Sequence, residues 1–226
     1  MPFADKLDRM CIAADRDARN LLRRHVHDLS LLVAAALKTG KWADLPVKSQ
    51  LLIHETADQA VDAADLADAA DFVSTKVLSA DNGKVVDLKS NGDFRTVQDR
   101  ILDLFETKQV PARGFVYVAW SARPEEFLYV GRAKDSGRLT LAAHGKLAHA
   151  TASASTVSLV FPTQSRDETI RSLEACIIRL VEHATGELPK LNARRERLPM
   201  GNSLQQLEQL GGFLANIAKR ITPLAD

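Results

Sequence analysis

The feature that most constrains the fold is a change of hydrophobic pattern at Pro111. Before it, apolar residues recur with helical spacing over residues 4–38 and 47–79. After it, the runs GFVYVAW (114–120) and EFLYVG (126–131) are rich in β-branched and aromatic residues, and only a short connection separates them. The sequence therefore predicts a long helical part that is followed by a β-hairpin.

The predicted fold class is α+β: a mostly helical N-terminal region, then a small antiparallel three-stranded sheet flanked by helices. Residues 79–93 hold two Asn-Gly pairs around a short apolar run, which indicates either a small strand or an ordered loop. The other expected elements are a helix at 94–108, a helix beginning at Asp135 or Ser136, a strand at 155–162, a helix at 167–185 ending at Gly186, a basic loop and a helix at 202–220. Pro111 separates a predicted helical domain, 1–110, from a second domain, 111–226.

The charge of the chain is divided unevenly between these two predicted domains. Residues 1–110 hold 15 Lys and Arg against 18 Asp and Glu, whereas residues 111–226 hold 15 against 11. The second part is therefore modestly basic, which is compatible with phosphate contacts. No apolar run approaches the length that spans a bilayer, and the first residues are too charged for a signal peptide, so we expect a cytoplasmic protein.

A glutamate lies within the apolar stripe of the helix predicted at 167–185. At about 100° per residue, Glu174 falls between Ile170 and Ile178, whereas Arg171 lies on another side. A carboxylate in such a stripe is unfavourable unless another group neutralises it. Two explanations stay open: an arginine or backbone N–H groups hold the carboxylate, or it is a metal ligand at the edge of a cleft.

Both tyrosines of the chain, Tyr117 and Tyr129, stand at matching places in the two hairpin strands. Gly131 follows the second tyrosine and lets another part of the chain approach closely. Cations then gather near the start of the next predicted helix, where a phosphate could bind; they are Arg132, Lys134 and Arg138. The alternative is that the tyrosines pack in the core and the cations beside them are solvated.

Taken in order, these residues resemble the GIY-YIG nuclease family. The matching pieces are FVY (115–117), YVG (129–131), an arginine, a helical glutamate followed by ACIIRL, and the P-x-x-N of 189–192. The family is named for two short tyrosine-bearing strand motifs, and it includes homing endonucleases, some restriction enzymes and an incision subunit of excision repair. The resemblance covers roughly residues 113–198 and implies an endonuclease that hydrolyses phosphodiester bonds, usually in DNA.

The resemblance implies a role for each matching residue. Tyr117 matches the catalytic tyrosine of the first motif, and Tyr129 matches the tyrosine of the second. Arg138 matches the catalytic arginine. Glu174 matches the glutamate that binds a divalent metal, Mg²⁺ or Mn²⁺, and Asn192 matches a late asparagine that helps to organise the site.

This chain departs from the family pattern at three positions. Phe115 occupies the glycine position of the first motif, and Arg138 lies one residue closer to Tyr129 than the family spacing. Ala142 stands where the family often has a histidine. His144 is retained as a candidate base or phosphate contact.

The implied mechanism is metal-assisted hydrolysis, in which Glu174 holds the ion while Arg138 stabilises negative charge on the phosphate. Tyr117 helps to activate the attacking water, and Tyr129 orients the water or the phosphate. This mechanism requires that side chains from distant parts of the sequence converge around one cation.

The expected partner is nucleic acid, most often double-stranded DNA, and no membrane is expected. The candidate backbone contacts are Arg132, Lys134, Lys190, Arg194 and Arg195. The alternative function is a catalytically inactive nucleic-acid-binding module on the same fold. A homodimer formed through residues 1–110 is left open.

Overall fold

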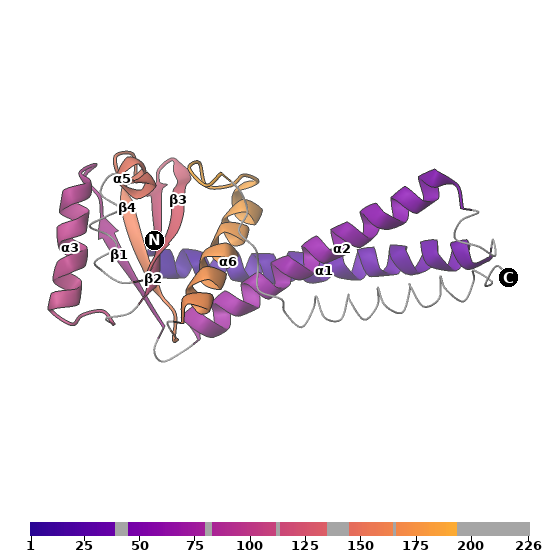
Figure 1. The fold of residues 1–226 in the computed structure, drawn as a ribbon, viewed down its shortest axis with the longest axis horizontal. Helices are drawn as coiled ribbons and strands as arrows, with labels where there is room; N and C mark the ends of the chain where they lie inside the picture. The colour runs from indigo at the N-terminus through magenta and orange to yellow at the C-terminus, as the bar shows by residue number, and fades with distance from the viewer. Residues whose placement is uncertain (39–44, 80–82, 112–113, 135–144, 165, 194–226) are drawn as a thin grey trace. The chain divides into compact units, whose positions relative to one another are not determined.

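The structure is a computed structural model that describes residues 1–38, 45–79, 83–111, 114–134, 145–164 and 166–193 (Figure 1). The chain forms two compact units. The first unit contains Met1–Ala14 and the described residues from Ala69 onward, and the second contains the described residues between Asp15 and Asp68. Whether residues 111–226 form an independent domain stays a prediction, as does the helix at 202–220, which lies outside the described residues.

The described part of the second unit consists of helical segments of α1 (Phe3–Lys38) and α2 (Val47–Val73), with residues 45–46 directly before α2. Its core is small and aliphatic, and it is built from Leu29, Ala36, Leu45 and Ile53. The two helices confirm the helical periodicity of 4–38 and of most of 47–79, although a short π-helix, η2 (Ser74–Leu78), ends the second pattern. No helix among the described residues is both long and apolar enough to cross a bilayer.

The first unit is built on one antiparallel sheet in the order β1-β4-β2-β3. The strands are β1 (Lys84–Lys89), β2 (Phe115–Ala122), β3 (Glu125–Ala133) and β4 (Thr156–Phe161). The α+β class is confirmed, but the sheet has four strands where the sequence predicted three. The additional strand is β1, from the segment for which a strand and a loop were both left open.

Each face of this sheet is covered by helices (Figure 1). Helices α3 (Phe94–Glu106) and α5 (Lys146–Thr151) cover one face, where their apolar residues share a core with alternate residues of all four strands. Helix α6 (Asp167–Thr185) and the start of α1 cover the other face. We call these the α3/α5 face and the α6 face.

The pattern of the sequence explains where these helices begin and end. Helix α3 begins after Asp93, whose carboxylate accepts hydrogen bonds from the Oγ1 of Thr96 (2.9 Å) and the backbone N–H of Arg95 (3.1 Å). These hydrogen bonds lower the pKa of Asp93. Helix α6 ends at Gly186, which adopts the left-handed conformation (φ 80°) that glycine tolerates best, and this confirms the predicted helix end.

The N-terminus of α1 is attached to the α6 face by a chain of polar contacts that runs from the buried Trp120 to Asp87, an exposed residue of β1. The backbone N–H of Phe3 donates to Oδ2 of Asp87 (2.8 Å), and the hydroxyl of Ser158 donates to Oδ1 of the same carboxylate (2.6 Å). The indole N–H of Trp120 donates to the Ser158 oxygen (2.8 Å). The Phe3 ring also packs on the rings of Trp120 and Phe127. A carboxylate from β1 therefore caps a helix that begins 84 residues earlier.

We predict that Asp87→Ala lowers the free energy of unfolding by about 1–3 kcal/mol, since the backbone N–H of Phe3 and the hydroxyl of Ser158, both on buried residues, lose their acceptor. Urea denaturation followed by circular dichroism measures the loss. The control is Asp99→Ala, an exposed position on α3, which should change the free energy by less than about 0.5 kcal/mol. Equal effects of the two substitutions would contradict the role of Asp87.

Candidate functional site

The two tyrosines lie together on the α3/α5 face of the sheet. Their ring centroids are 5.9 Å apart and the rings are tilted by 52°. Tyr117 is only 6% exposed and belongs to the core cluster of that face, whereas Tyr129 is half-buried and packs against the cluster. The pair therefore brings the two sequence motifs into contact, and Tyr117 is also a core residue.

Gly131 makes the position of Tyr117 possible. The register pairs Tyr117 on β2 with Gly131 on β3. A Cβ atom at Gly131 would lie 2.7 Å from the Tyr117 hydroxyl and 2.7 Å from a ring carbon, a distance that real side chains do not adopt. The phenol therefore lies across a backbone position where only glycine leaves room for it.

The α6 face holds the glutamate. Nη1 of Arg132 lies 2.9 Å from Oε2 of Glu174, and the two side chains are 29% and 13% exposed. This is the first of the two explanations that the sequence left open, because an arginine neutralises the carboxylate within the apolar stripe. The ion pair also joins α6 to β3.

A second group of charges lies beside this pair. Oδ2 of Asp167 lies 2.9 Å from Arg171, and its Oδ1 lies 3.4 Å from Nζ of Lys134. Burial opposes ionisation of Asp167, but the hydrogen bond from Lys134 and the charges of Arg171, Lys134 and Arg132 outweigh it, so the pKa of Asp167 is lowered. Sequence reasoning missed Asp167, although it stands seven residues before Glu174 on the same helix and therefore on nearly the same side.

The register places the phenols and the Glu174 ion pair on opposite faces of the sheet. Tyr117 pairs with Gly131, and Val116 pairs with Arg132. Because successive residues of a strand point to opposite faces, Arg132 points away from the face that holds the tyrosines. The structure thus brings Tyr117 to Tyr129, and Arg132 to Glu174, but it does not bring these two pairs onto one face.

Asn192 lies against the same strand, next to both pairs. Its amide N–H donates to the Val130 carbonyl (2.8 Å) and its Oδ1 accepts from the Val130 N–H (2.9 Å). The backbone N–H groups of Lys190 and Leu191 donate to carbonyls of β3 as well. Residues 190–191 therefore bond β3 through their backbone, and Asn192 extends this pairing to Val130 through its side-chain amide.

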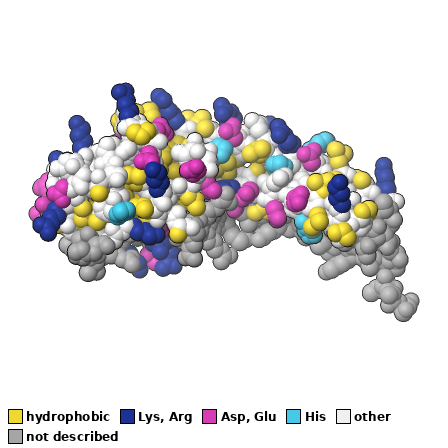
Figure 2. All heavy atoms as spheres, turned by 90° about the horizontal axis from the view of Figure 1, so that it is seen from above, with side chains coloured by type: hydrophobic (Ala, Val, Ile, Leu, Met, Phe, Trp, Pro, Cys, Tyr) yellow, Lys and Arg dark blue, Asp and Glu magenta, His cyan; other side chains and the backbone are white. Residues whose placement is uncertain are grey.

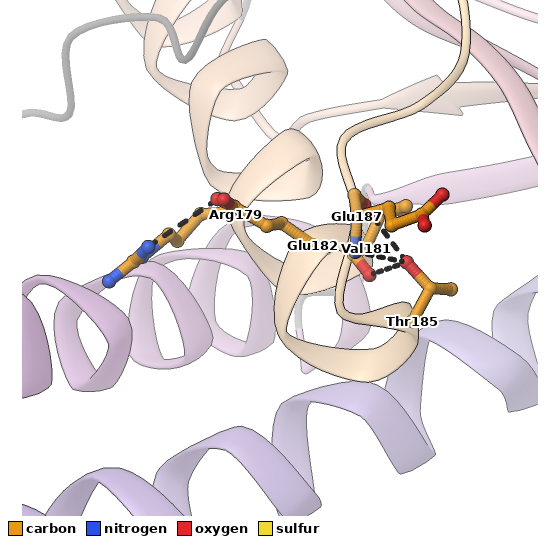
Figure 3. A network of polar contacts seen from close by, with 5 residues as sticks. All are labelled: Arg179, Val181, Glu182, Thr185 and Glu187. Atoms are coloured by element: carbon orange, nitrogen blue, oxygen red, sulfur yellow. Dashed lines mark hydrogen bonds and ion pairs between the residues drawn. The ribbon is translucent and has the colours of Figure 1, made fainter.

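Figure 3 shows the polar contacts at the end of α6, from which the chain continues to this segment. The hydroxyl of Thr185 donates to the Val181 carbonyl (2.8 Å) and also lies within bonding distance of the Glu187 carbonyl (2.9 Å). One turn earlier, Arg179 and Glu182 form an ion pair with 3.4 Å between Nη1 and Oε2. The Thr185 hydroxyl therefore joins the last turn of α6 to the residue after Gly186, and the chain continues from there to Asn192.

The remaining predicted residues are divided between described and undescribed segments. Lys190 is described, and its ammonium forms an ion pair with Glu126 on β3. The other candidates, namely Arg138, His144, Arg194 and Arg195, lie outside the described residues. Their assigned roles stay predictions, as does the helix start at Asp135 or Ser136.

The donor set for a metal is small. No group of three or more His, Cys, Asp or Glu side chains that could hold an ion is present in the part of the chain that the structure describes. Mg²⁺ keeps several waters and takes one or two carboxylates together with substrate phosphates, so a single glutamate suffices in principle. Glu174 fits this role if a metal ion replaces Arg132 as its partner.

Comparison of the chain with family models, with curated proteins and with solved structures found no match. The resemblance to GIY-YIG nucleases therefore depends on the motif residues of the sequence alone.

We predict that Gly131→Ala lowers the free energy of unfolding by about 1–3 kcal/mol, because the new methyl group overlaps the Tyr117 ring. In a Tyr117→Leu background the same substitution should cost clearly less, since the ring is gone. A double-mutant cycle from urea denaturation measures the difference. An equal cost of Gly131→Ala in both backgrounds would show that the phenol does not lie over Gly131.

The lowered pKa of Asp167 predicts a pH-dependent contribution to stability. A carboxylate whose pKa is lowered on folding contributes stability that is present above the unfolded pKa of about 3.9 and is lost as the pH falls through the folded value. Asp167→Asn should therefore be less stable than wild type near neutral pH, and the gap should narrow as the solution is acidified. Chemical denaturation at a series of pH values measures the difference in the free energy of unfolding between wild type and Asp167→Asn. A difference that grows as the pH falls would contradict a lowered pKa of Asp167.

Proposed function

We propose that the chain is a metal-dependent endonuclease that hydrolyses phosphodiester bonds, with DNA as its substrate. The observation that carries the proposal is the convergence of separate motif segments on the end of β3. Tyr117 lies over Gly131, Glu174 bonds Arg132, and Asn192 bonds Val130. Elements that are weak signals in the sequence therefore meet on consecutive residues of one edge strand.

The carboxylate of Glu174 is the group that would hold Mg²⁺ or Mn²⁺, which supplies charge stabilisation at the scissile phosphate. Were Glu174 to hold the ion, the guanidinium of Arg132 would be available to a phosphate oxygen, which it could bind through two parallel hydrogen bonds. In this proposal Arg132 pairs with Glu174 without metal and would contact the substrate when the metal is bound.

The tyrosines act from the other face. In this proposal the reacting phosphate lies across the end of β3. Gly131, under the Tyr117 phenol, and Arg132, which faces α6, are consecutive residues there, so the two faces of the sheet are closest along the chain at this point. Tyr129, which is half-buried, orients a water or a phosphate oxygen there, and Tyr117 supports it from within the core. Arg138 completes the site by stabilising negative charge on the phosphate.

The charge of the surface bears on the DNA partner. On the face drawn in Figure 2, Lys and Arg side chains of the described residues lie in separate groups among Asp and Glu. The described residues on that face therefore form no broad cationic surface that would support DNA binding. DNA contact is proposed to depend on Arg132, Lys134 and the basic segment at 190–195.

A second candidate function is a nucleic-acid-binding module without catalysis. One observation favours it: Glu174 is engaged by Arg132 on the α6 face, whereas both phenols lie on the α3/α5 face. In this case the ion pair is a structural link between α6 and β3. The two candidates differ in whether the chain cuts DNA, because a binding module would shift DNA without cutting it.

We predict that the wild-type chain nicks supercoiled plasmid in the presence of Mg²⁺ and that Glu174→Gln lowers the rate by at least about 100-fold, as the loss of several kcal/mol of transition-state stabilisation requires. The glutamine keeps the shape of the side chain and can still accept a hydrogen bond from Arg132. The measurement is the nicking rate on duplex, nicked, branched and RNA substrates.

The matched control is Glu168→Gln, an exposed carboxylate on the same helix, which should cut at the wild-type rate. Unchanged melting temperatures would exclude unfolding as the cause of a loss in Glu174→Gln. Binding without cutting by the wild-type chain in Mg²⁺ and Mn²⁺ would support the binding module, and full activity of Glu174→Gln would remove Glu174 from the mechanism.

A further inference from the structure

Two of the cations that the sequence assigned to the tyrosines, Arg132 and Lys134, form ion pairs with residues of α6, and the third, Arg138, lies outside the described residues. Arg132 pairs with Glu174 on the α6 face, and Lys134 pairs with Asp167, which belongs to α6. A phosphate that approaches Tyr129 on the α3/α5 face would therefore need a positive charge other than Arg132 and Lys134. The described cation that does lie beside the Tyr129 ring belongs to none of the motifs.

Lys146 lies over Tyr129. Its Nζ is 5.9 Å from the centroid of the Tyr129 ring, within the range of a cation–π contact. Lys146 itself is exposed, and among the described residues no carboxylate forms an ion pair with it. Its ammonium therefore differs from those of Lys134 and Lys190, which both face carboxylates.

The position of Lys146 is set by the core beneath it. It is the first residue of α5, and the next residue, Leu147, is 1% exposed in the same core cluster as Tyr117. Ala150 is buried in that cluster as well, and Thr151 donates to the Leu147 carbonyl (2.7 Å). Burial of this side of α5 holds Lys146 at the surface beside the tyrosine.

We propose that Lys146 and Tyr129 form an anion site for a phosphate of the nucleic-acid backbone on the α3/α5 face. The ammonium supplies the charge and the phenol supplies a hydrogen bond. Lys146 acts as a binding and positioning residue, and it touches the substrate rather than the metal. The choice of nucleic acid as the ligand rests on the proposed function. A lysine that only packs over an aromatic ring, worth about 0.5–1 kcal/mol at an exposed site, is the alternative.

The salt dependence of DNA binding tests this site without any cleavage. In metal-free buffer, the affinity for a short duplex is measured over a range of salt concentrations for wild type, Lys146→Met, Lys146→Arg and the control Lys108→Met, an exposed lysine after α3. Loss of one phosphate contact lowers the slope of log affinity against log salt by about 1. We expect this decrease for Lys146→Met only, because arginine keeps the charge.

Fluorine NMR locates the contact at Tyr129. Because the chain has two tyrosines, a fluorotyrosine-labelled sample gives two resonances, and Tyr117→Phe assigns them. The Tyr129 resonance should move when duplex is added to wild type and to Lys146→Arg, and should stay in place for Lys146→Met. A purely structural lysine would change the resonance of the DNA-free protein but would not change the salt slope.

The outcomes separate this inference from the proposed function. Lys146-dependent binding with no cleavage by wild type supports the anion site and overturns the nuclease. Cleavage that requires Glu174, with an unchanged salt slope in Lys146→Met, overturns the anion site and supports the nuclease. Absence of salt-dependent binding by the wild-type chain overturns both. Circular dichroism spectra and melting temperatures verify that each variant is folded before it is scored.

Discussion

The pairing of Tyr117 with Gly131 is the contact on which the candidate site depends. It fixes the register of β2 and β3, since a shift by one residue would place a side chain where the phenol now lies. Because successive residues of a strand point to opposite faces, this register places Tyr129 on the face of Tyr117 and turns Arg132 towards α6. The ion pair with Glu174 and the contact with Lys146 are both consequences of that one register.

Strand β3 is consequently the element that all parts of the site share. It lies at the edge of the sheet, and the segment before Asn192 continues its pairing up to Val130. The two faces hold different chemistry, with phenols and an ammonium on one side and a carboxylate with its guanidinium on the other. A reaction that uses both sets has to take place around the end of this strand, and a binding function needs only one of them.

Much of the fold could be predicted from local patterns. Gly186 ends α6 as expected, and the hairpin strands were predicted to within a few residues, because these features depend on neighbours in the sequence. The apolar stripe around Glu174 correctly indicated that the carboxylate needs a partner. The identity of that partner, Arg132, was open, since it depends on how α6 lies on the sheet.

Long-range pairing is what the sequence could not supply. The strand that the sequence did not settle, β1, has only a six-residue pattern, and its place beside β4 is fixed by partners 67 to 77 residues away. The bond between Phe3 and Asp87 has no local signal either. The motif residues were expected on one face for the same reason. The sequence gives their order along the chain, but it does not give the strand register, which places Tyr117 and Arg132 on opposite faces of the sheet.

The most direct test of this account is a NOESY spectrum of the chain in solution, in which two tyrosines give few and well-separated ring signals. The account predicts cross-peaks from the Tyr117 ring to the α-protons of Gly131 and to the Tyr129 ring. Cross-peaks from the Tyr117 ring to the side chain of Arg132, with none to Gly131, would place the phenol on the α6 face and contradict the account.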